Sequence, residues 1–421
     1  MRFAVLLILS LSTLFGCSRT GSFAQPTAAA PQPSVVTFGT GTDCQPKIVL
    51  FFYNHRTADG GAANAMFGFG AAATTSQRMA GFSRSTDASG SSDADRAVST
   101  SLAIVVISTA QAIIASADLV SLNTDGFELT WTVTDATARI INYVAIGGSD
   151  VTNIAIGTFT GSGSPQEINF GVAFQADLLI LYGPGNATGN NFTTTIGMVT
   201  ASDSWSVSSS AENGDTNMVT KRLQRTGISF NPLAGGGTVL SECTTVLDAD
   251  GFTQTCPTQG AAVTQYVAIK GGSYKLGSFT QPVTPNTGNQ TISGVGFTPK
   301  TLLLAAYGTT AQSTLQANSR ASWGAGTSSA NRWSIWYGDT DAAATSVTSS
   351  YLDRTKIFHT KTEAGATPTA QTAADLVSFG SGEFVLNHTT VDATARQILY
   401  LAISTAEASA ATSIPRRVFI Q

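Results

Sequence analysis

The chain has 421 residues, of which 11% are charged, 42% are hydrophobic and 41 are glycine. The hydrophobic fraction excludes a wholly disordered chain, because disorder requires low hydrophobicity and a high net charge. The net charge of −4 arises from 22 basic and 26 acidic residues, without the cluster of Lys and Arg that a phosphate-binding surface needs. We therefore expect no nucleic-acid partner.

Residues 1–34 read as a secretory signal and a Pro/Ala linker outside the fold. Arg2 precedes an apolar run that is too short for a membrane-spanning helix. The letters LFGC are similar to a bacterial lipobox, which would make Cys17 the site of lipidation. Cleavage after Ala24 is the rival route, and an uncleaved apolar tail is the third.

Beyond this segment the sequence repeats itself. The run ADLVSLNTDGFELTWTVTDATARIINYVAI returns as ADLVSFGSGEFVLNHTTVDATARQILYLAI. A more diverged middle copy is marked by YVAIKGG at Tyr266, which corresponds to YVAIGG at Tyr143 and YLAIS at Tyr400. The middle copy lacks the letters DATAR, which occupy 135–139 and 392–396 in its neighbours. The repeat predicts modules at 35–161, 162–281 and 282–421, each closed by the strand that follows the tyrosine motif.

Within each module the hydrophobic pattern is that of short strands. Phe127, Leu129, Trp131 and Val133 alternate with polar residues, as in a strand with one buried and one exposed face. The turn motifs NTDG, DADG and GSGE separate such runs. About seven or eight strands per module favour an antiparallel β-sandwich of the jelly-roll or immunoglobulin-like type. We predict an all-β chain of three such modules after the signal segment, and a closed propeller is the weaker alternative.

Two cysteines flank the turn of the middle module. Alignment on the turn places Cys243 at the position of Asp118 and Asp375, and Cys256 at the position of Trp131 and His388. Two facing positions on paired strands that are both cysteine predict a disulfide, which needs an oxidising compartment. The alternative is two independent buried thiols. We expect Cys44 to be a small buried residue without a partner, unless Cys17 is not acylated and lies close to it.

The search for chemistry yields few candidates. His388 and Asp375 are expected to face each other across the hairpin, as the orienting half of a catalytic triad would. No GxSxG motif supplies a nucleophile, so we interpret the pair as a structural cross-strand contact and predict no catalytic residue. No cysteine or histidine spacing predicts a metal site, and we expect no cofactor.

Two segments are candidate ligand-binding sites. The first is the polar loop FYNHRTADGG, and the alternative is a turn that only caps its strand. The second is the aromatic run NRWSIWYGD, which could place one face in the core and present the other to a sugar or a partner subunit; core packing of the whole run is the alternative. The tentative ligand-binding residues are Asn54, His55, Arg56, Asp59, Trp333, Trp336 and Tyr337.

The motif GVGFTPKTLLLAAYG, followed by ADLVSF and VDATARQILYLAI, resembles repeat modules of tailed-bacteriophage virion structural proteins of the tail or fibre type. The resemblance implies a structural role and supplies no catalytic residues. We therefore expect a non-enzymatic, extracellular structural or attachment protein of a phage particle, such as a tail, fibre or decoration component. The alternative is a secreted or lipid-anchored bacterial surface protein, such as a glycan-binding adhesin, and a third is an extracellular hydrolase.

The expected partners follow from this reading. They are other copies of the chain or neighbouring virion or surface proteins, together with cell-surface glycans. Contact with a membrane is expected only through a lipid on Cys17. The expected location is extracellular, either in the virion or at the bacterial outer surface.

Overall fold

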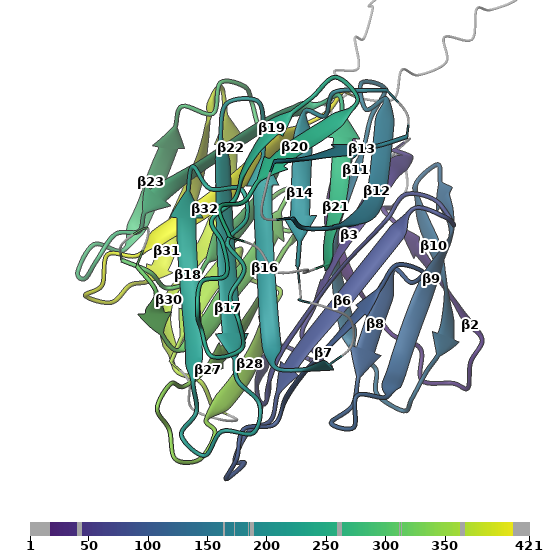
Figure 1. Ribbon diagram of the computed structural model, residues 1–421. Helices are drawn as coiled ribbons and strands as arrows, with labels where there is room; N and C mark the ends of the chain where they lie inside the picture. Colours follow the sequence, from purple (N-terminus) through teal and green to yellow (C-terminus); the bar gives the residue numbers. More distant parts are fainter. Residues whose placement is uncertain are drawn as a thin grey trace, which may run out of the picture.

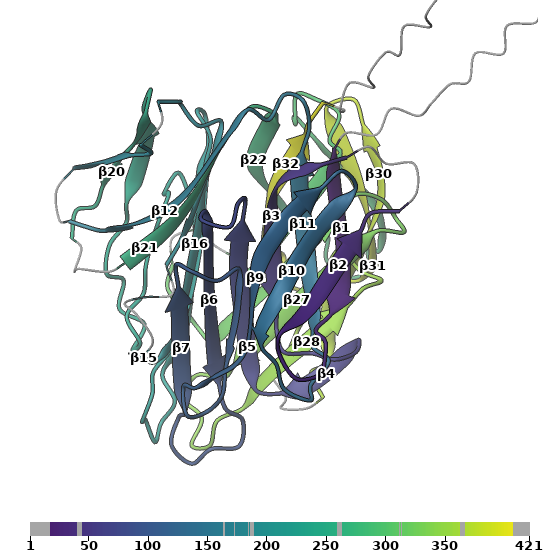
Figure 2. The ribbon, with the colours of Figure 1, turned by 90° about the vertical axis from the view of Figure 1, so that its right-hand side faces the viewer.

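The computed structural model describes residues 17–39, 44–162, 165–171, 173–183, 185, 189–258, 263–310, 312, 314–362 and 367–406. These residues form 32 strands and no helix, and every strand pairing is antiparallel. The predicted all-β class is confirmed. Three β-sandwiches lie side by side (Figures 1 and 2). The predicted signal at 1–16 lies outside the described residues.

The three modules contain matching sets of strands. Module 1 contains β1 (Ser18–Ala24), β2 (Gln32–Thr37), β3 (Pro46–Tyr53), β4 (Gly60–Ala63), β5 (Ala65–Ala72), β6 (Arg78–Ser85), β7 (Ala94–Ser99), β8 (Ile104–Ile107), β9 (Ile113–Asn123), β10 (Gly126–Val133) and β11 (Ile140–Gly147). Module 2 contains β12 (Asn153–Thr160), β13 (Gln166–Asn169), β14 (Leu178–Tyr182), β15 (Gly189–Asn190), β16 (Phe192–Val199), β17 (Ser204–Ala211), β18 (Thr220–Thr226), β19 (Thr244–Leu247), β20 (Gly251–Thr255) and β21 (Val263–Lys270). Module 3 contains β22 (Ser273–Thr280), β23 (Gly288–Ser293), β24 (Thr301–Ala306), β25 (Gln316–Ala317), β26 (Ser319–Gly326), β27 (Arg332–Asp339), β28 (Thr348–Asp353), β29 (Phe358–Lys361), β30 (Ala370–Gly380), β31 (Glu383–Thr390) and β32 (Gln397–Ser404).

Each module packs a large sheet against a small one. The large sheets each have seven strands, in the orders β1-β11-β3-β5-β6-β7-β15, β12-β21-β14-β16-β17-β18-β25 and β22-β32-β24-β26-β27-β28-β4. The small sheets are β2-β10-β9-β8, β13-β20-β19 and β23-β31-β30-β29. A separate hydrophobic cluster fills each sandwich, as expected for two sheets packed face to face.

The predicted module boundaries fall one strand too late. β12 pairs with β21 of module 2 and β22 with β32 of module 3, so the strand after each tyrosine motif opens the next module. β1 takes the same place in module 1, where it pairs with β11 along its whole length. The exclusion of residues 1–34 from the fold is therefore wrong from residue 17 onwards, because β1 and β2 are integral strands. Cleavage after Ala24 would remove β1.

A glycine on these first strands explains why the sequence repeats there. A Cβ added to Gly21, Gly157 or Gly277 would meet the ring of a tyrosine on the paired strand. The tyrosines are those of the repeated motif, at 143, 266 and 400. The letters GSFA, GTFT and GSFT are thus the signature of this strand, and the first lies directly after the apolar leader.

The modules exchange strands around a closed ring. β15 of module 2 joins the large sheet of module 1, β25 of module 3 joins that of module 2, and β4 of module 1 joins that of module 3. The two-residue strands β15 and β25 are each held by an arginine, because Arg96 donates to Asn190 O and Arg222 to Ala317 O. The four-residue strand β4 forms a longer ladder with β28.

An asparagine ends each exchanged strand in the same way. Asn64, Asn191 and Asn318 have φ of 73°, 76° and 65°, a left-handed conformation that asparagine tolerates better than most residues. Their side-chain oxygens accept hydrogen bonds from the backbone N–H groups of Asp87, Asn213 and Asp341, each at 2.8 Å.

The three residues that donate these backbone hydrogen bonds use their own side chains to reach a neighbouring module. Asp87 accepts from Thr348 N at 2.7 Å, Asn213 from Ala94 N at 2.8 Å, and Asp341 from Thr220 N at 2.8 Å. These residues lie in the turns after β6, β17 and β27 and at the strands that follow, at the lower end of the view in Figure 1. One threefold set of contacts therefore ties this end of the ring together.

The inner faces of the large sheets meet in one common core. This cluster includes Phe52 and Phe67 of module 1, Trp205 of module 2, and Trp323 and Trp333 of module 3 among residues from all three modules. Trp205 Nε1 donates to Tyr400 O and Trp333 Nε1 to Tyr143 O, both at 3.1 Å. A module removed from the ring would expose its share of this core, so the three modules form one body.

Candidate functional site: three equivalent grooves

The predicted polar loop of module 1 is an interface with module 3. Asn54 is fully buried, and its Nδ2 donates to Trp336 O at 3.3 Å and to Tyr351 O at 2.6 Å. Asp59 forms an ion pair with Arg354 at 2.9 Å. The expectation of a ligand-binding residue is therefore wrong for Asn54, which is fully buried, whereas it stays a prediction for the exposed Asp59.

The other two predicted ligand-binding residues of this loop, His55 and Arg56, are part of the packed structure of module 1. The carbonyl of Arg56 accepts a hydrogen bond from Ile140 N at 2.7 Å. His55 has a φ of 64°, and burial, reinforced by the nearby positive charge of Arg139, lowers its pKa to about 4. His55 is thus neutral at pH 7 and acts as part of the packed turn.

The predicted aromatic platform is buried. Trp333 and Tyr337 belong to the common core, as their shared parity indicates, and Trp336 on the other face is 1% exposed. Core packing of the whole run, the alternative interpretation of this segment, is therefore correct. The three side chains cannot contact an external ligand because none reaches the surface.

Both cysteine pairs form disulfides. Cys243 and Cys256 are joined with their Cα atoms 4.2 Å apart, which confirms the predicted bridge. Cys17 and Cys44 form the second, with Cα atoms 5.1 Å apart. Cys44 is buried, as expected, and its partner is Cys17, the exception that the sequence left open. A Cys17 sulfur bonded to Cys44 cannot carry a lipid, so the bridge and lipidation of Cys17 exclude each other. Two disulfides indicate an oxidising, extracellular environment.

The expected contact between His388 and Asp375 does not form. Asp375 lies opposite Asn387, one residue away from the expected register, and binds Arg332 and Lys356 instead. The ring of His388 contacts Gln290 Oε1 at 2.9 Å, and burial lowers its pKa to about 4. His388 is still interpreted as a structural residue, but its partner is Gln290 and not Asp375.

A serine–histidine contact escaped the sequence analysis. Ser334 Oγ lies 2.7 Å from Nδ1 of His359. Both residues are at most 1% exposed, and burial keeps the pKa of His359 well below its usual value. A nucleophile in this position cannot reach a substrate, so the contact belongs to the interior of module 3.

Concave surface occurs instead where neighbouring modules meet. Three grooves of about 500, 520 and 530 Å³ lie between modules 1 and 2, modules 2 and 3, and modules 3 and 1. Each is bounded by the turn that joins the fifth and sixth strands of one module, by the third-last strand of that module, and by the first strand of the next module or the residues leading into it. The grooves are therefore equivalent positions around the ring.

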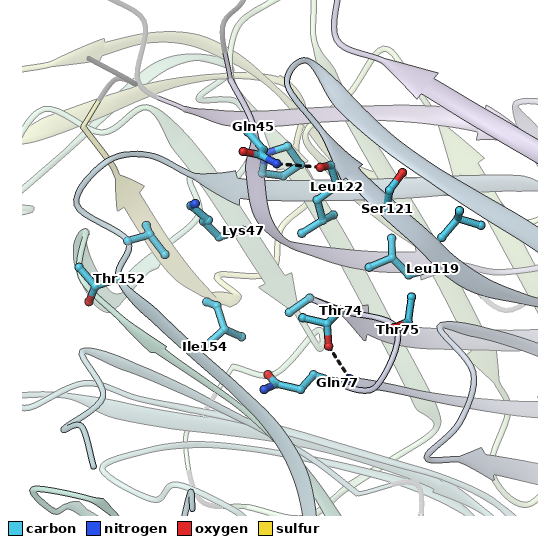
Figure 3. Close-up of a pocket in the computed structure, with 14 residues that line it drawn as sticks. Gln45, Lys47, Thr74, Thr75, Gln77, Leu119, Ser121, Leu122, Thr152 and Ile154 are labelled. Atoms are coloured by element: carbon cyan, nitrogen blue, oxygen red, sulfur yellow. Dashed lines mark hydrogen bonds between the residues drawn. The ribbon is translucent and has the colours of Figure 1, made fainter. Parts of the chain in front are cut away.

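The groove between modules 1 and 2 is shown in Figure 3. Gln45 and Lys47 at the start of β3 face it together with Thr152 and Ile154, which lead into module 2 (Figure 3). Gln45 Nε2 donates to Leu122 O at 2.8 Å. The lining contains one lysine, several hydroxyl and amide groups, and no aromatic ring.

One lining residue of the groove between modules 2 and 3, Asp203, forms an ion pair. Lys275 on β22 binds Asp203 in the turn after β16 at 2.8 Å. Desolvation raises the pKa of Asp203, but hydrogen bonds from Lys275 and Ser202 outweigh it and hold that pKa below its ordinary value. The positive charge on the first strand is thus neutralised from the facing turn.

The groove between modules 3 and 1 is different in composition. Arg19 on β1 takes the place of Lys275, and Asn331 ends the facing turn where module 2 has Asp203. Lys300 lies at the same position as Lys47 of the first groove, directly after a proline. Phe38 and Phe379, both half-buried, complete the lining, which contains no acidic residue. None of these residues was singled out from the sequence.

Other kinds of site are not evident in the described part of the chain. No group of three or more His, Cys, Asp or Glu side chains that could hold a metal ion occurs there. No helix of membrane-spanning length and hydropathy is present in the same residues.

Comparisons with known proteins assign the chain to no family. No protein-family model matches it, and none of the curated proteins matches it. Among solved structures it aligns with β-fructofuranosidase from Schwanniomyces occidentalis, complexed with fructosyl-erythritol, at 9% identity over 96% of this chain and 100% of that chain. The TM-score of 0.13 is too low to indicate a shared fold.

Proposed function

We propose that this protein is a non-enzymatic structural and attachment component of an extracellular phage particle. The observation that carries the proposal is the closed ring, in which three sandwiches share one core and exchange one strand each. Such an arrangement gives a rigid body with its loops and grooves at fixed positions, which suits a particle component exposed to proteases and shear. The repeat motifs that resemble tail and fibre proteins support the same role.

The polar groups that the sequence repeats within modules 1 and 3 support this proposal. The side chains of the DATAR motifs fold back on themselves, as Arg139 binds Asp135 and Arg396 binds Asp392 at 2.5 Å. Gln25 N and Gln281 N then donate to the arginine carbonyls at 2.8 and 3.0 Å. The ionisable residues that the sequence repeats are thus used to join strands.

A surface protein of the producing bacterium is the alternative, and the two disulfides favour it as much as they favour a virion. Neither form of the proposal includes a lipid anchor on Cys17, because a lipid on that sulfur would prevent the Cys17–Cys44 disulfide.

Mass spectrometry of fractionated cultures tests the proposal. We expect the intact chain, with both disulfides, in purified particles, and labelling of the particle surface by an antibody against it. A chain found in the cell envelope or the particle-free medium, with particles that lack it, would replace the virion role with the surface alternative. Hydrolysis of polysaccharide or peptidoglycan by the purified chain would contradict the non-enzymatic role.

A further inference from the structure

We infer that the groove between modules 3 and 1 binds an acidic saccharide, meaning a sugar chain that carries carboxylate groups. This inference deepens the attachment role and rests on it for its biological meaning. The groove is lined by Arg19, Phe38, Lys300, Asn331, Val377 and Phe379 together with several hydroxyl groups. Its volume of about 530 Å³ lies within the range of about 300–1,000 Å³ that small-ligand sites occupy.

The charge of the lining selects an anion. Two of the lining residues are cationic and none is acidic, in a protein whose net charge is −4. Arginine binds a carboxylate through two parallel hydrogen bonds, and lysine adds a point charge. A carboxylate in this groove would therefore be favoured over a neutral group of the same shape.

The aromatic and polar groups of the lining fit a sugar ring, which has an apolar face and hydroxyl groups at its edge. Phe38 is half-buried, stacked on Tyr143 with ring centroids 5.9 Å apart, and Phe379 is half-buried against the core of module 3. Such rings offer a rigid apolar surface at low entropic cost. Ser328, Ser329 and Asn331 in the facing turn supply hydrogen-bonding groups.

The walls of this groove are held in place from both modules. Thr20 Oγ1 on β1 donates to Asn331 O at 2.9 Å and lies 3.3 Å from Thr327 Oγ1. Ser18 Oγ lies 3.2 Å from Thr405 Oγ1 at the end of module 3. The site therefore exists before a ligand binds, which reduces the ordering cost of binding.

The other two grooves serve as internal controls. The groove between modules 1 and 2 has Lys47 in place of Lys300, but Ala155 stands where Arg19 does and Leu122 where Phe379 does. The groove between modules 2 and 3 has an acidic residue, Asp203, in its lining. Only the third combines two cations with two aromatic rings on the same scaffold.

Titration of the purified full-length chain with a tetrasaccharide of galacturonic acid, followed by calorimetry, tests the inference. We expect binding that weakens at least tenfold when the carboxylates are methyl-esterified and that weakens as salt is added. The double variant Arg19→Gln/Lys300→Gln should lose at least tenfold in affinity, whereas Lys47→Gln in the equivalent groove should leave it unchanged.

Three results would overturn the inference: no binding of the acid form at millimolar concentration, equal binding of the methyl ester, or an equal loss in Lys47→Gln and the double variant. Thermal melts of both variants verify that they fold. None of these outcomes depends on whether the protein is found in a particle, so the site and the proposed function can fail separately.

Discussion

Modules 1 and 3 fasten their small sheet to their large sheet with an ion pair, whereas module 2 fastens two strands of its small sheet with a disulfide. Arg78 and Arg332, the first residues of β6 and β27, bind Asp118 and Asp375 at 2.7 and 3.1 Å. Module 2 has Ser204 and Cys243 at these positions. Arginine and aspartate have thus been replaced together.

A β-bulge explains why the same two positions meet in one module and miss each other in the others. The pairing of β9 with β10 skips Val120, and that of β30 with β31 skips Val377. β19 and β20 pair without a shift, so Cys243 lies directly opposite Cys256. Each bulge moves the register by one residue, which turns Asp118 and Asp375 away from their expected partners and towards the arginines. Both bulge valines are 42% exposed and line grooves.

The position that Trp131, Cys256 and His388 share is filled in a different way in each module. Trp131 and His388 are fully buried and bind the same place on the neighbouring edge strand, since Trp131 Nε1 donates to Ser34 Oγ at 3.0 Å and His388 contacts Gln290. Cys256 replaces both with a covalent bond. The comparison indicates that module 2 exchanged a large side chain for a cross-link.

The largest expected effect is therefore at Trp131. Trp131→Ala should destabilise the protein by about 3–5 kcal/mol, because it removes a fully buried aromatic ring and leaves a cavity. Chemical denaturation measures the free energy of unfolding. Val133→Ala, at a surface position of the same strand, is the control and should cost less than about 0.5 kcal/mol. Equal costs for both would show that Trp131 does not support the sandwich.

The disulfide of module 2 should come next. Replacing Cys243 and Cys256 with alanine should cost about 3 kcal/mol, the value expected for freeing a loop of that length in the unfolded chain. Because the modules share a core, the melting temperature of the whole chain should fall, without a separate transition for module 2. A melt in which only one third of the unfolding enthalpy moves would contradict the shared core.

Lowering the pH should destabilise the protein through His388, which has the position in module 3 that Trp131 has in module 1. The folded-state pKa of His388 is lowered to about 4 from an ordinary value of about 6.5. Its stabilising contribution is fully present above pH 6.5 and is lost as pH falls from 6.5 towards 4, because the unfolded chain binds the proton first. A shift of this size corresponds to a loss of about 3 kcal/mol for His388, because one pKa unit is worth about 1.4 kcal/mol.

A swap of the module 1 pair into module 3 isolates this effect. In His388→Trp/Gln290→Ser, the part of the pH dependence due to His388 should disappear, while that of His55 and His359 stays. The measurement is the slope of unfolding free energy against pH between 6.5 and 4.5. An unchanged slope would mean that the pKa of His388 is the same in the folded and the unfolded chain.

A transplanted disulfide tests the bulge through the state of two thiols rather than through stability. Asp375→Cys/His388→Cys should leave both thiols free, because the bulge at Val377 separates them in register. The matched variant Asp375→Cys/Asn387→Cys should form the bond, because these two residues lie opposite each other in the ladder. Titration of free thiols after denaturation distinguishes the two states. A bond between residues 375 and 388 in the first variant would show that the register is not fixed by the bulge.

The repeat, the strand class and the Cys243–Cys256 bridge were predictable because each depends on a pattern compared within the chain. The strand with which each module begins was not predicted. The first such strand, which contains Gly21, directly follows the apolar leader and was assigned to that leader. The bulges at Val120 and Val377 add no unusual letter to the sequence, so the partner of Asp375 was assigned one residue out of register.

The exchanged strands and the grooves could not be predicted for a different reason. β15 and β25 have only two residues each, too few to show any periodicity. Arg19, Lys300 and Phe379 come together only through the closure of the ring, which joins parts of the chain that are far apart in sequence.

Differential scanning calorimetry of the intact, oxidised chain tests the closed ring most directly. Three modules that share one core and exchange strands should unfold in a single transition, with the calorimetric enthalpy equal to the van't Hoff enthalpy. Two or three separate transitions, each with the enthalpy of about one module, would show that the modules are independent and would contradict the account.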